Sequence, residues 1–424
     1  MTYLRFAICA LVAFGVLAHG GVEDWARACF EIGGALLFLA WAVWLFLHNE
    51  ETIVISPLLP PLVAFTLVVL AQLLFSTTAS TFSTHTEFTL LLADVLVVFV
   101  AVQAFRTLED WRGFVWFVMI FGFLVSVFGI LQHLTFNGKL YWFREMHYGG
   151  IPFGPYVNRN HFAGFAELFI PMALVPLMLG KVRRERLIIV GLFAVVSIGS
   201  LFLAASRGGI ISFLVEVFVI VVWMILRRTG KRQLLAGAAV LLAVVVMVSW
   251  LGVKEITERF SSMKTLEVAS GKRASMRRDT WRIFLDHPLI GTGLGTLEIV
   301  FPPYDTLYDG RIVNHSHNDY LEALAETGIA GGFCCALFLG MLMFHALRQI
   351  SGRKPSLTSV LNLSGFVACI GFLVHSFVDF NLHLPANAVL FFLMGTLATT
   401  TISANKNDAN KSPSKSSMRH HQHG

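Results

Sequence analysis

Charged residues are scarce in this chain. Asp, Glu, Lys and Arg make up 14% of its 424 residues, whereas soluble domains contain about 25%. Hydrophobic residues make up 56%, and the mean hydropathy is +0.70. The chain therefore lacks the polar surface that a soluble protein of this size needs. This composition predicts an all-α integral membrane protein and excludes an ordinary soluble enzyme.

Cysteine is also rare, and recognisable cofactor motifs are missing. The five cysteines lie in or beside apolar runs and show no metal-ligand spacing, so they indicate neither a zinc site nor a redox compartment. Gly291, Gly293 and Gly295 follow no strand and lack the Gly-Lys-Ser/Thr ending of a phosphate loop. We interpret them as a close-packed turn and expect neither nucleotide nor nucleic-acid binding.

Apolar runs of about 20 residues predict transmembrane helices. The first run has a poor cleavage site after Ala18, so a retained first span is favoured over a signal peptide. We expect about twelve spans, at 3–20, 29–48, 55–75, 87–105, 113–134, 161–180, 187–205, 209–226, 233–251, 319–347, 358–377 and 384–402.

Lys and Arg in short loops predict the orientation of these spans. In the twelve-span arrangement four basic clusters fall on one side, with both termini; they include Arg106, Arg184, Arg228 and Arg353. We therefore predict cytoplasmic termini. The expected domains are helices 1–9 over 1–251, a large outer loop over 252–318 between helices 9 and 10, helices 10–12 over 319–402, and a disordered cytoplasmic tail over 403–424.

Two histidines precede the tenth predicted span, in Asn314-His315-Ser316-His317-Asn318-Asp319-Tyr320. The pKa of histidine suits proton transfer near neutrality. Ser316 or Asn318 can cap the helix, and the helix dipole then keeps His317 neutral, as a general base requires. A pair held by structural hydrogen bonds is the other interpretation. A metal site needs a third ligand, such as Asp319 or His287, and the spacing matches no zinc pattern.

Arginines on the same outer face offer an anion site. Arg207 lies in a short turn between two apolar runs, where it either clamps a phosphate or snorkels to lipid headgroups. Arg277 and Trp281 share a helical face, and Arg278 is adjacent. That helix either receives a diphosphate or lies at the membrane interface. Both alternatives stay open at each position.

Further polar residues lie near the ends of spans. Arg159 and His161 begin the sixth span, and Glu167 lies within it. His375 ends the eleventh span, where a helix would pair it with Asp379. Ionisable groups at this depth usually line a cavity. Because all these residues share one face in the predicted topology, we expect a single outward-facing polar cavity.

With these residues in view, the chain resembles the O-antigen ligase family of bacterial inner-membrane proteins, which includes polysaccharide polymerases and protein-targeting oligosaccharyltransferases. The resemblance rests on His317-Asn318, nine residues, and then Gly328. It runs from about residue 155 to 400, and the first five spans match in hydrophobicity alone. Supporting segments are Asn158–Gly164, Ser206–Gly209, Arg277 with Trp281, Asp286–Gly293, and His375 with Asp379.

The resemblance implies a GT-C-like glycosyltransferase without metal or cofactor, in the bacterial inner membrane, with a periplasmic site. It implies that His317 is catalytic and deprotonates an acceptor hydroxyl, which attacks an undecaprenyl-diphosphate-linked glycan with inversion. Arg207 and Arg277 would bind the donor diphosphate, with Arg278 as the alternative to Arg277. The residues expected to support this site are His315, Asn318, Arg159, His161, His375 and Asp379.

We therefore expect transfer of O-antigen polysaccharide to lipid A–core, for lipopolysaccharide biosynthesis. The alternative is a polysaccharide polymerase or a protein O-oligosaccharyltransferase that uses the same donor. A transporter is a less favoured third hypothesis. It predicts charge in the middle of spans and repeat symmetry, and no inverted repeat is found in the sequence.

Overall fold

The computed structural model describes residues 1–48, 52–145, 150–227, 230, 235, 237–239, 242, 246, 263–308, 310–352 and 356–402. Within these residues the chain is helical, and extended backbone pairs at two isolated bridges, Leu140 with Arg144 and Phe153 with Tyr156. The prediction of an all-α protein is confirmed for the described residues.

Eleven of the twelve predicted spans are found as helices. The remaining one, the ninth span at 233–251, lies largely outside the described residues. Eight of the helices are long and apolar enough to cross a membrane, and three are shorter but apolar. The chain is thus a multi-pass membrane protein. The helices are α1 (Thr2–Leu17), α2 (Asp24–Leu47), α3 (Leu59–Leu74), α4 (Thr81–Ala104), α5 (Leu108–Leu134), α6 (Arg159–Met178), α7 (Leu187–Leu203), α8 (Arg207–Leu226), α12 (Asp319–Ile350), α13 (Leu357–His375) and α14 (Pro385–Thr399).

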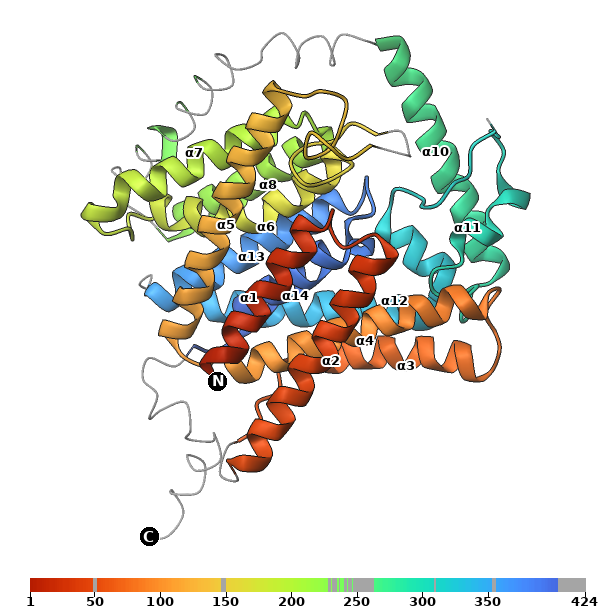
Figure 1. The fold of residues 1–424 in the computed structure, drawn as a ribbon, viewed down its shortest axis with the longest axis horizontal. Helices are drawn as coiled ribbons and strands as arrows, with labels where there is room; N and C mark the ends of the chain where they lie inside the picture. The colour runs from red at the N-terminus through yellow and green to blue at the C-terminus, as the bar shows by residue number, and fades with distance from the viewer. Residues whose placement is uncertain are drawn as a thin grey trace.

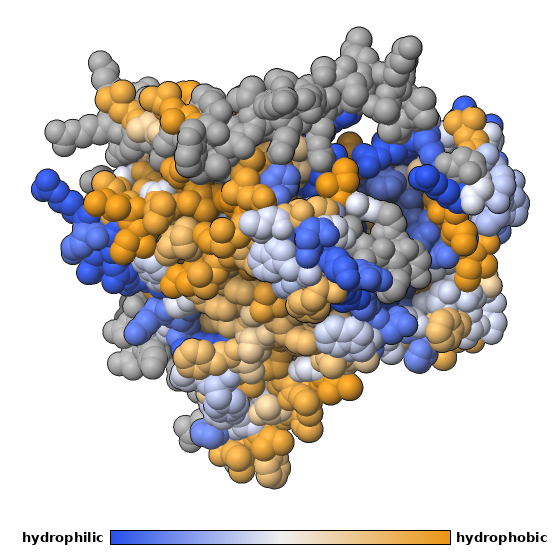
Figure 2. Space-filling view, turned by 45° about the horizontal axis from the view of Figure 1, so that its top comes forward, coloured by the Kyte–Doolittle hydropathy of each residue, from blue (hydrophilic) through white to orange (hydrophobic). Residues whose placement is uncertain are grey.

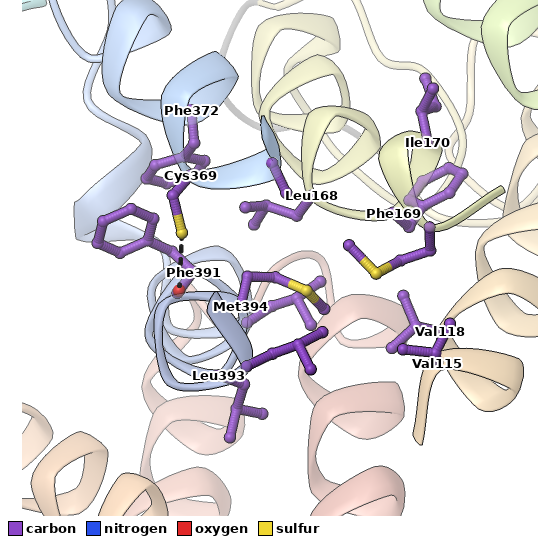
Figure 3. Close-up of a cluster of buried hydrophobic side chains, with 14 of the residues drawn as sticks. Val115, Val118, Leu168, Phe169, Ile170, Cys369, Phe372, Phe391, Leu393 and Met394 are labelled. Carbon is purple, nitrogen blue, oxygen red and sulfur yellow. Dashed lines mark hydrogen bonds between the residues drawn. The ribbon is translucent and has the colours of Figure 1, made fainter. Parts of the chain in front are cut away.

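Helix α13 lies at the centre of the bundle and packs against α6, α8, α12 and α14 (Figure 1). Phe372 of α13 stacks on Phe391 of α14 with ring centroids 4.9 Å apart. Figure 3 shows these rings in one buried cluster with Leu168 and Phe169 of α6, and Val118 of α5 at the opposite side of that cluster. Since lipid is as apolar as these side chains, close packing rather than a hydrophobic effect holds the helices together. The centre of the bundle is thus a closely packed apolar core.

The outer surface of the bundle is apolar, as a lipid-facing surface must be. Phe46, Phe82, Ile188 and Leu226 are all highly exposed large hydrophobic side chains. Figure 2 shows broad hydrophobic areas across the face in view, with hydrophilic residues at its left edge and in a band through its right half. Because a soluble protein rarely exposes so much apolar surface, this agrees with a position in a bilayer.

The predicted outer loop contains α10 (Met263–Asp286), α11 (Leu297–Val300) and the short 3-10 helix η2 (Pro302–Tyr304). Helix α10 confirms that Arg277 and Trp281 lie on one helix, and residues 252–262 lie outside the described part of the chain. Helix α10 packs against α12. A small apolar core ties the loop to α12; its buried members are Ile283, Leu297, Phe301, Val313 and Ala325.

Glycines let this loop touch the backbone of α12. Gly291 has φ +69°, and a Cβ there would collide with the backbone of Glu326. Gly328 has φ +61° and kinks α12, and a Cβ there would collide with the backbone of Leu289. The predicted close-packed turn is thus confirmed. Gly328, the glycine that follows the histidine motif, is needed because other residues rarely adopt its positive φ.

Candidate functional site

The start of α12 is joined to the end of α13. The side-chain amide of Asn318 donates to the carbonyl of Phe377 at 3.1 Å, and its carbonyl oxygen caps α12. The backbone N–H of Asp319 donates to the carbonyl of Ser376 at 3.0 Å. These contacts hold His317 just before the helix, with φ +53°. Asn318 therefore acts as the predicted helix cap, and it fixes the position of the neighbouring histidine.

His317 contacts Asp379, which lies in the loop after α13. Nδ1 of His317 donates to Oδ1 of Asp379 at 3.2 Å, and Asp379 is 1% exposed. Burial alone would raise the pKa of Asp379, but the hydrogen bond from His317 and the charges of His161 and His375 hold it below its usual range. An ionised carboxylate fixes the Nδ1–H tautomer, so Nε2 of His317 carries the free lone pair that a general base needs.

Phe380 lies among three of the predicted histidines. The ring of His315 stacks on it at 4.2 Å between centroids. The rings of His161 and His317 contact it edge-on, at 4.8 Å and 5.0 Å. This residue was not predicted, because nothing in the sequence distinguishes it from the other phenylalanines. The contacts show that His161, His315 and His317 belong to one cluster.

His315 also joins a network of carboxylates. Its Nδ1 lies 2.6 Å from Oε1 of Glu322, which is also 3.2 Å from Nε2 of His383. Nδ1 of His383 lies 3.2 Å from Asp319. Burial would lower the pKa of His383, but the charge of Glu322 and the hydrogen bond to Asp319 outweigh it and raise that pKa to about 10. His383 is therefore an imidazolium held between two carboxylates.

His315, Glu322 and His383 carry side chains that could together bind a metal ion. The ligand atoms of His315, Glu322 and His383 lie within 4.8 Å of one another, and this is the one such group in the described chain. The third ligands that we considered, His287 and Asp319, are not part of it. Glu322 already contacts both histidines, at 2.6 Å from Nδ1 of His315 and 3.2 Å from Nε2 of His383. A metal-independent site stays a prediction.

The side chain of His375 does not pair with that of Asp379, contrary to our expectation; the two residues meet through the backbone, where the N–H of Asp379 donates to the carbonyl of His375 at 3.1 Å. Helix α13 ends at His375, so the two residues are not on one helix. Instead, Nδ1 of His375 lies 2.9 Å from Oε1 of Glu167, and both side chains are buried. The other edge of the ring faces Gly208, where a Cβ would collide with it. His375 thus connects the end of α13 with the turn that carries Arg207.

Two helices that reach the cluster begin with arginine. Arg207 is exposed at the first position of α8, after the cap Ser206. Arg159 is the first residue of α6, after the cap Asn158, and its buried Nη1 has no hydrogen-bond partner among the described residues. A cation at a helix N-terminus opposes the helix dipole, so neither arginine is placed there for helix stability.

The N-termini of α6, α8 and α12 meet at the loop that follows α13. His161 of α6 lies 3.9 Å from Asp379. Gly208 of α8 contacts His375, and Asp319 of α12 bonds to Ser376. Helix N-termini carry partial positive charge and unpaired N–H groups, so this end of the bundle favours an anion.

The two candidate arginines of α10 differ in their contacts. Arg278 donates to Thr306 at 2.7 Å and to Ser275 at 3.2 Å, and it lies 3.6 Å from Asp279. Among the described residues the side chain of Arg277 has no hydrogen-bond or ion-pair partner, which leaves its guanidinium available to a ligand. No contact links either arginine to the histidine cluster within the described chain. The structure thus unites the histidines, Asp379 and the Arg207 turn, while Arg277 and Arg278 stand apart on α10.

Sequence reasoning missed the network around His383. Asp319, Glu322 and Glu326 recur at helical spacing, which signals a carboxylate face on α12. That pattern could have identified Glu322 as the partner of His315. The contact with His383 could not be found in this way, because it joins residues 61 positions apart, at 322 and 383.

Comparison with known proteins confirms the family resemblance. The model of the family described as O-antigen ligase matches residues 192–336, a range that contains Arg207, α10 and the histidine motif. Teichuronic acid biosynthesis protein TuaE of Bacillus subtilis (strain 168) is 25% identical over 283 residues, which covers 63% of this chain and 54% of that protein. The chain thus spans about half the length of this curated relative.

Proposed function

We propose that this chain, whose residues 192–336 match the O-antigen ligase family, transfers O-antigen polysaccharide from undecaprenyl diphosphate to lipid A–core. The reaction takes place at the periplasmic face of the bacterial inner membrane, and both termini are cytoplasmic. The observation that carries the proposal is the hydrogen bond from His317 to Asp379, because it leaves Nε2 of His317 free to accept a proton.

His317 acts as the general base. Its Nε2 takes the proton of an acceptor hydroxyl, and the oxygen attacks the anomeric carbon of the lipid-linked glycan. The bond from that carbon to the diphosphate breaks, undecaprenyl diphosphate leaves, and the anomeric centre inverts. Asp379 stabilises the imidazolium that forms on His317, as an ionised and buried carboxylate can.

The arginines bind the donor diphosphate. Arg207 stands at the N-terminus of α8, where the guanidinium and the helix dipole both favour a phosphate. Arg277, whose side chain has no partner among the described residues, supplies a second cation. The bonds of Arg278 to Thr306 and Ser275 favour a role for that residue in the fold of the loop. Fixed cations stabilise the negative charge that grows on the leaving group. Arg159 supports this side of the site.

The second candidate function differs from the first in its acceptor, which would be a growing glycan or a protein instead of lipid A–core. The relative from Bacillus subtilis is named for teichuronic acid biosynthesis, which favours a polymerase that extends a growing glycan from the same kind of donor. Transfer to a protein would use the same lipid-linked donor and the same donor site. The transporter hypothesis predicted charge within spans, and Asp94, Glu167 and Glu216 are indeed buried within α4, α6 and α8. The family match nevertheless favours glycosyl transfer.

Reconstitution tests the proposal. The full-length protein in nanodiscs is supplied with an undecaprenyl-diphosphate-linked glycan and lipid A–core, and we expect glycan on the lipid A–core. Lack of transfer to any acceptor would overturn the proposal. In a strain without the gene, unligated glycan on the lipid carrier indicates a ligase, and a product with a single repeat indicates a polymerase.

A further inference from the structure

The last turns of α10 are amphipathic. One face is buried in the outer loop and carries Asp279 and Ile283, both 0% exposed. The opposite face is exposed and combines apolar side chains with arginine, at Arg278, Trp281, Arg282 and Leu285. These four positions recur at helical spacing and so share one face. A face that combines Trp, Leu and Arg is typical of a helix at a membrane surface.

The exposed apolar side chains of α10 continue toward α12. Trp281 and Leu285 are 42% and 56% exposed, and Leu289, three residues after the helix, is 72% exposed. The carbonyl of Leu289 accepts from the N–H of Ala330 in α12 at 3.1 Å. Ile329, the neighbour of Ala330, is also exposed, at 55%. The apolar surface of the loop thus adjoins that of a helix long enough to cross a membrane.

The length of α12 places this junction at the edge of the bilayer. Helix α12 has 32 residues, whereas a span needs about 20. Its part after the kink, 329–350, is about 33 Å long at about 1.5 Å per residue, close to the thickness of about 30 Å of a hydrocarbon core. Phe333 and Leu337 in this part are exposed, as a lipid-facing surface requires. Leu289 therefore lies where the hydrocarbon ends and the headgroups begin.

The backbone of the loop bonds to the protein, as a segment at this depth must. The carbonyl of Pro288 accepts from the N–H of Ile329 at 2.8 Å. The side chain of Gln72 donates to the carbonyl of Ile290 at 2.6 Å and accepts from the N–H of Leu294 at 3.2 Å. Irregular backbone is tolerated at membrane depth only where protein or enclosed water takes up its hydrogen bonds. Because a loop in open water needs no such partners, these bonds support an inserted position.

The polar part of the exposed face is basic. Arg278 and Arg282 have 58% and 53% of their side-chain surface exposed, and each lies 3.6 Å from Asp279. One carboxylate thus serves two guanidinium groups. Residues 271–286 contain five basic and two acidic side chains. This excess of positive charge favours the headgroup of an anionic phospholipid over a neutral one.

We propose that the end of α10 and the loop after it form a membrane anchor that binds anionic phospholipid, at the end of the bundle that carries the histidine cluster. The apolar side chains insert beside the acyl chains, and Arg278 and Arg282 contact the headgroup phosphates. This lipid contact does not depend on the proposed transfer. One consequence, that the anchor holds Arg277 at the depth of a lipid-linked diphosphate, rests on the proposed function.

Fluorescence quenching of the full-length protein in nanodiscs tests the insertion. The contribution of Trp281 is the difference between the wild type and Trp281→Phe. We expect brominated phosphatidylglycerol to quench this contribution and aqueous iodide to quench it weakly. Trp111→Phe is the matched control, because Trp111 is 0% exposed and its contribution should respond less to either quencher. Stronger quenching of Trp281 by iodide than by brominated lipid would overturn the proposal, and so would no quenching by the lipid.

Exchange of the brominated lipid tests the choice of headgroup. At equal mole fraction, phosphatidylglycerol should quench Trp281 more than phosphatidylcholine does, by up to about fivefold. Arg282→Gln should reduce this preference, because it removes one of the two exposed cations of the face. Arg273→Gln is the matched control. It removes the same charge from α10, but about 13 Å further along the helix, beyond the Debye length of about 8 Å.

Two outcomes of the lipid exchange contradict the anionic anchor. Equal quenching by the two lipids would assign the contact to neutral lipid. An equal loss of preference in Arg282→Gln and Arg273→Gln would remove the assignment to this face of α10. Lack of transfer by the wild type contradicts the proposed function alone, because quenching is measured without a donor or an acceptor.

Discussion

His317 and Asp379 lie 62 residues apart in the chain, and Nδ1 of the histidine donates to Oδ1 of the carboxylate at 3.2 Å. The contact joins the loop before α12 to the loop after α13. It fixes which nitrogen of His317 carries the proton. Both histidines of the motif bond to a buried carboxylate through Nδ1, His317 to Asp379 and His315 to Glu322.

Asp379→Asn tests the charge of this pair. The amide oxygen can still accept from His317, so the orientation of the ring is preserved, but the negative charge that stabilises the imidazolium is lost. We expect kcat to fall by about 10²–10⁴-fold with little change in the donor KM. Steady-state kinetics in nanodiscs measure this. A wild-type kcat in a folded Asp379→Asn protein would show that the carboxylate has no catalytic role.

Arg277→Ala and Arg278→Ala form a matched pair on one helix. Removing Arg277 should reduce kcat/KM for the lipid-linked donor by about 10-fold or more, since a charge-assisted bond to phosphate is lost. Removing Arg278 breaks contacts to Thr306 and Ser275 and should change kcat/KM less. Donor titrations compare the two variants. The reverse order would assign the diphosphate to Arg278.

Gly328→Ala tests the kink in α12. The residue has φ +61° and contacts the backbone of Leu289, so alanine should cost about 1–3 kcal/mol of stability. Gly340→Ala on the same helix is the control, because no atom lies within 4 Å of a Cβ placed there. It should be neutral or stabilise by up to about 1 kcal/mol. Thermal unfolding of both variants decides this, and equal effects would contradict the assigned role of Gly328.

His383 makes stability depend on pH. Its pKa is raised to about 10 in the folded protein, from about 6.5 when unfolded. A raised pKa contributes stability that is complete below the unfolded value and is lost as pH rises through the folded value. The unfolding temperature should therefore fall between about pH 6.5 and pH 10. His383→Gln should show a shallower fall over this range, and an unchanged slope would argue against the imidazolium.

Removal of metal ions tests the predicted absence of a metal cofactor. Transfer by protein treated with a chelator should proceed at the untreated rate, because His317 and the arginines supply the charges that the reaction needs. The control is the same protein with added divalent metal. Loss of transfer that Zn²⁺ or Mn²⁺ restores would instead assign a metal to His315, Glu322 and His383.

Hydrophobic run length was enough to predict the positions of the described spans, since each must cross the same thickness of bilayer. The start of α12 was also predictable, because Asn318 is a helix cap directly before an apolar run. The contact from His317 to Asp379 was not, since the motifs gave the order of the segments but not which side chains meet. His375 shows the same limit: helical spacing suggested Asp379 as its partner, but α13 ends first and Glu167 takes that place.

The most direct test of the account is the rate of a single turnover with a lipid-linked donor for wild-type and His317→Ala protein. His85→Ala, at an exposed histidine of α4, is the control and should match the wild type. We predict that His317→Ala lowers the rate of transfer by about 10²–10⁴-fold while the protein still binds the donor. Transfer at the wild-type rate by His317→Ala would contradict the mechanism.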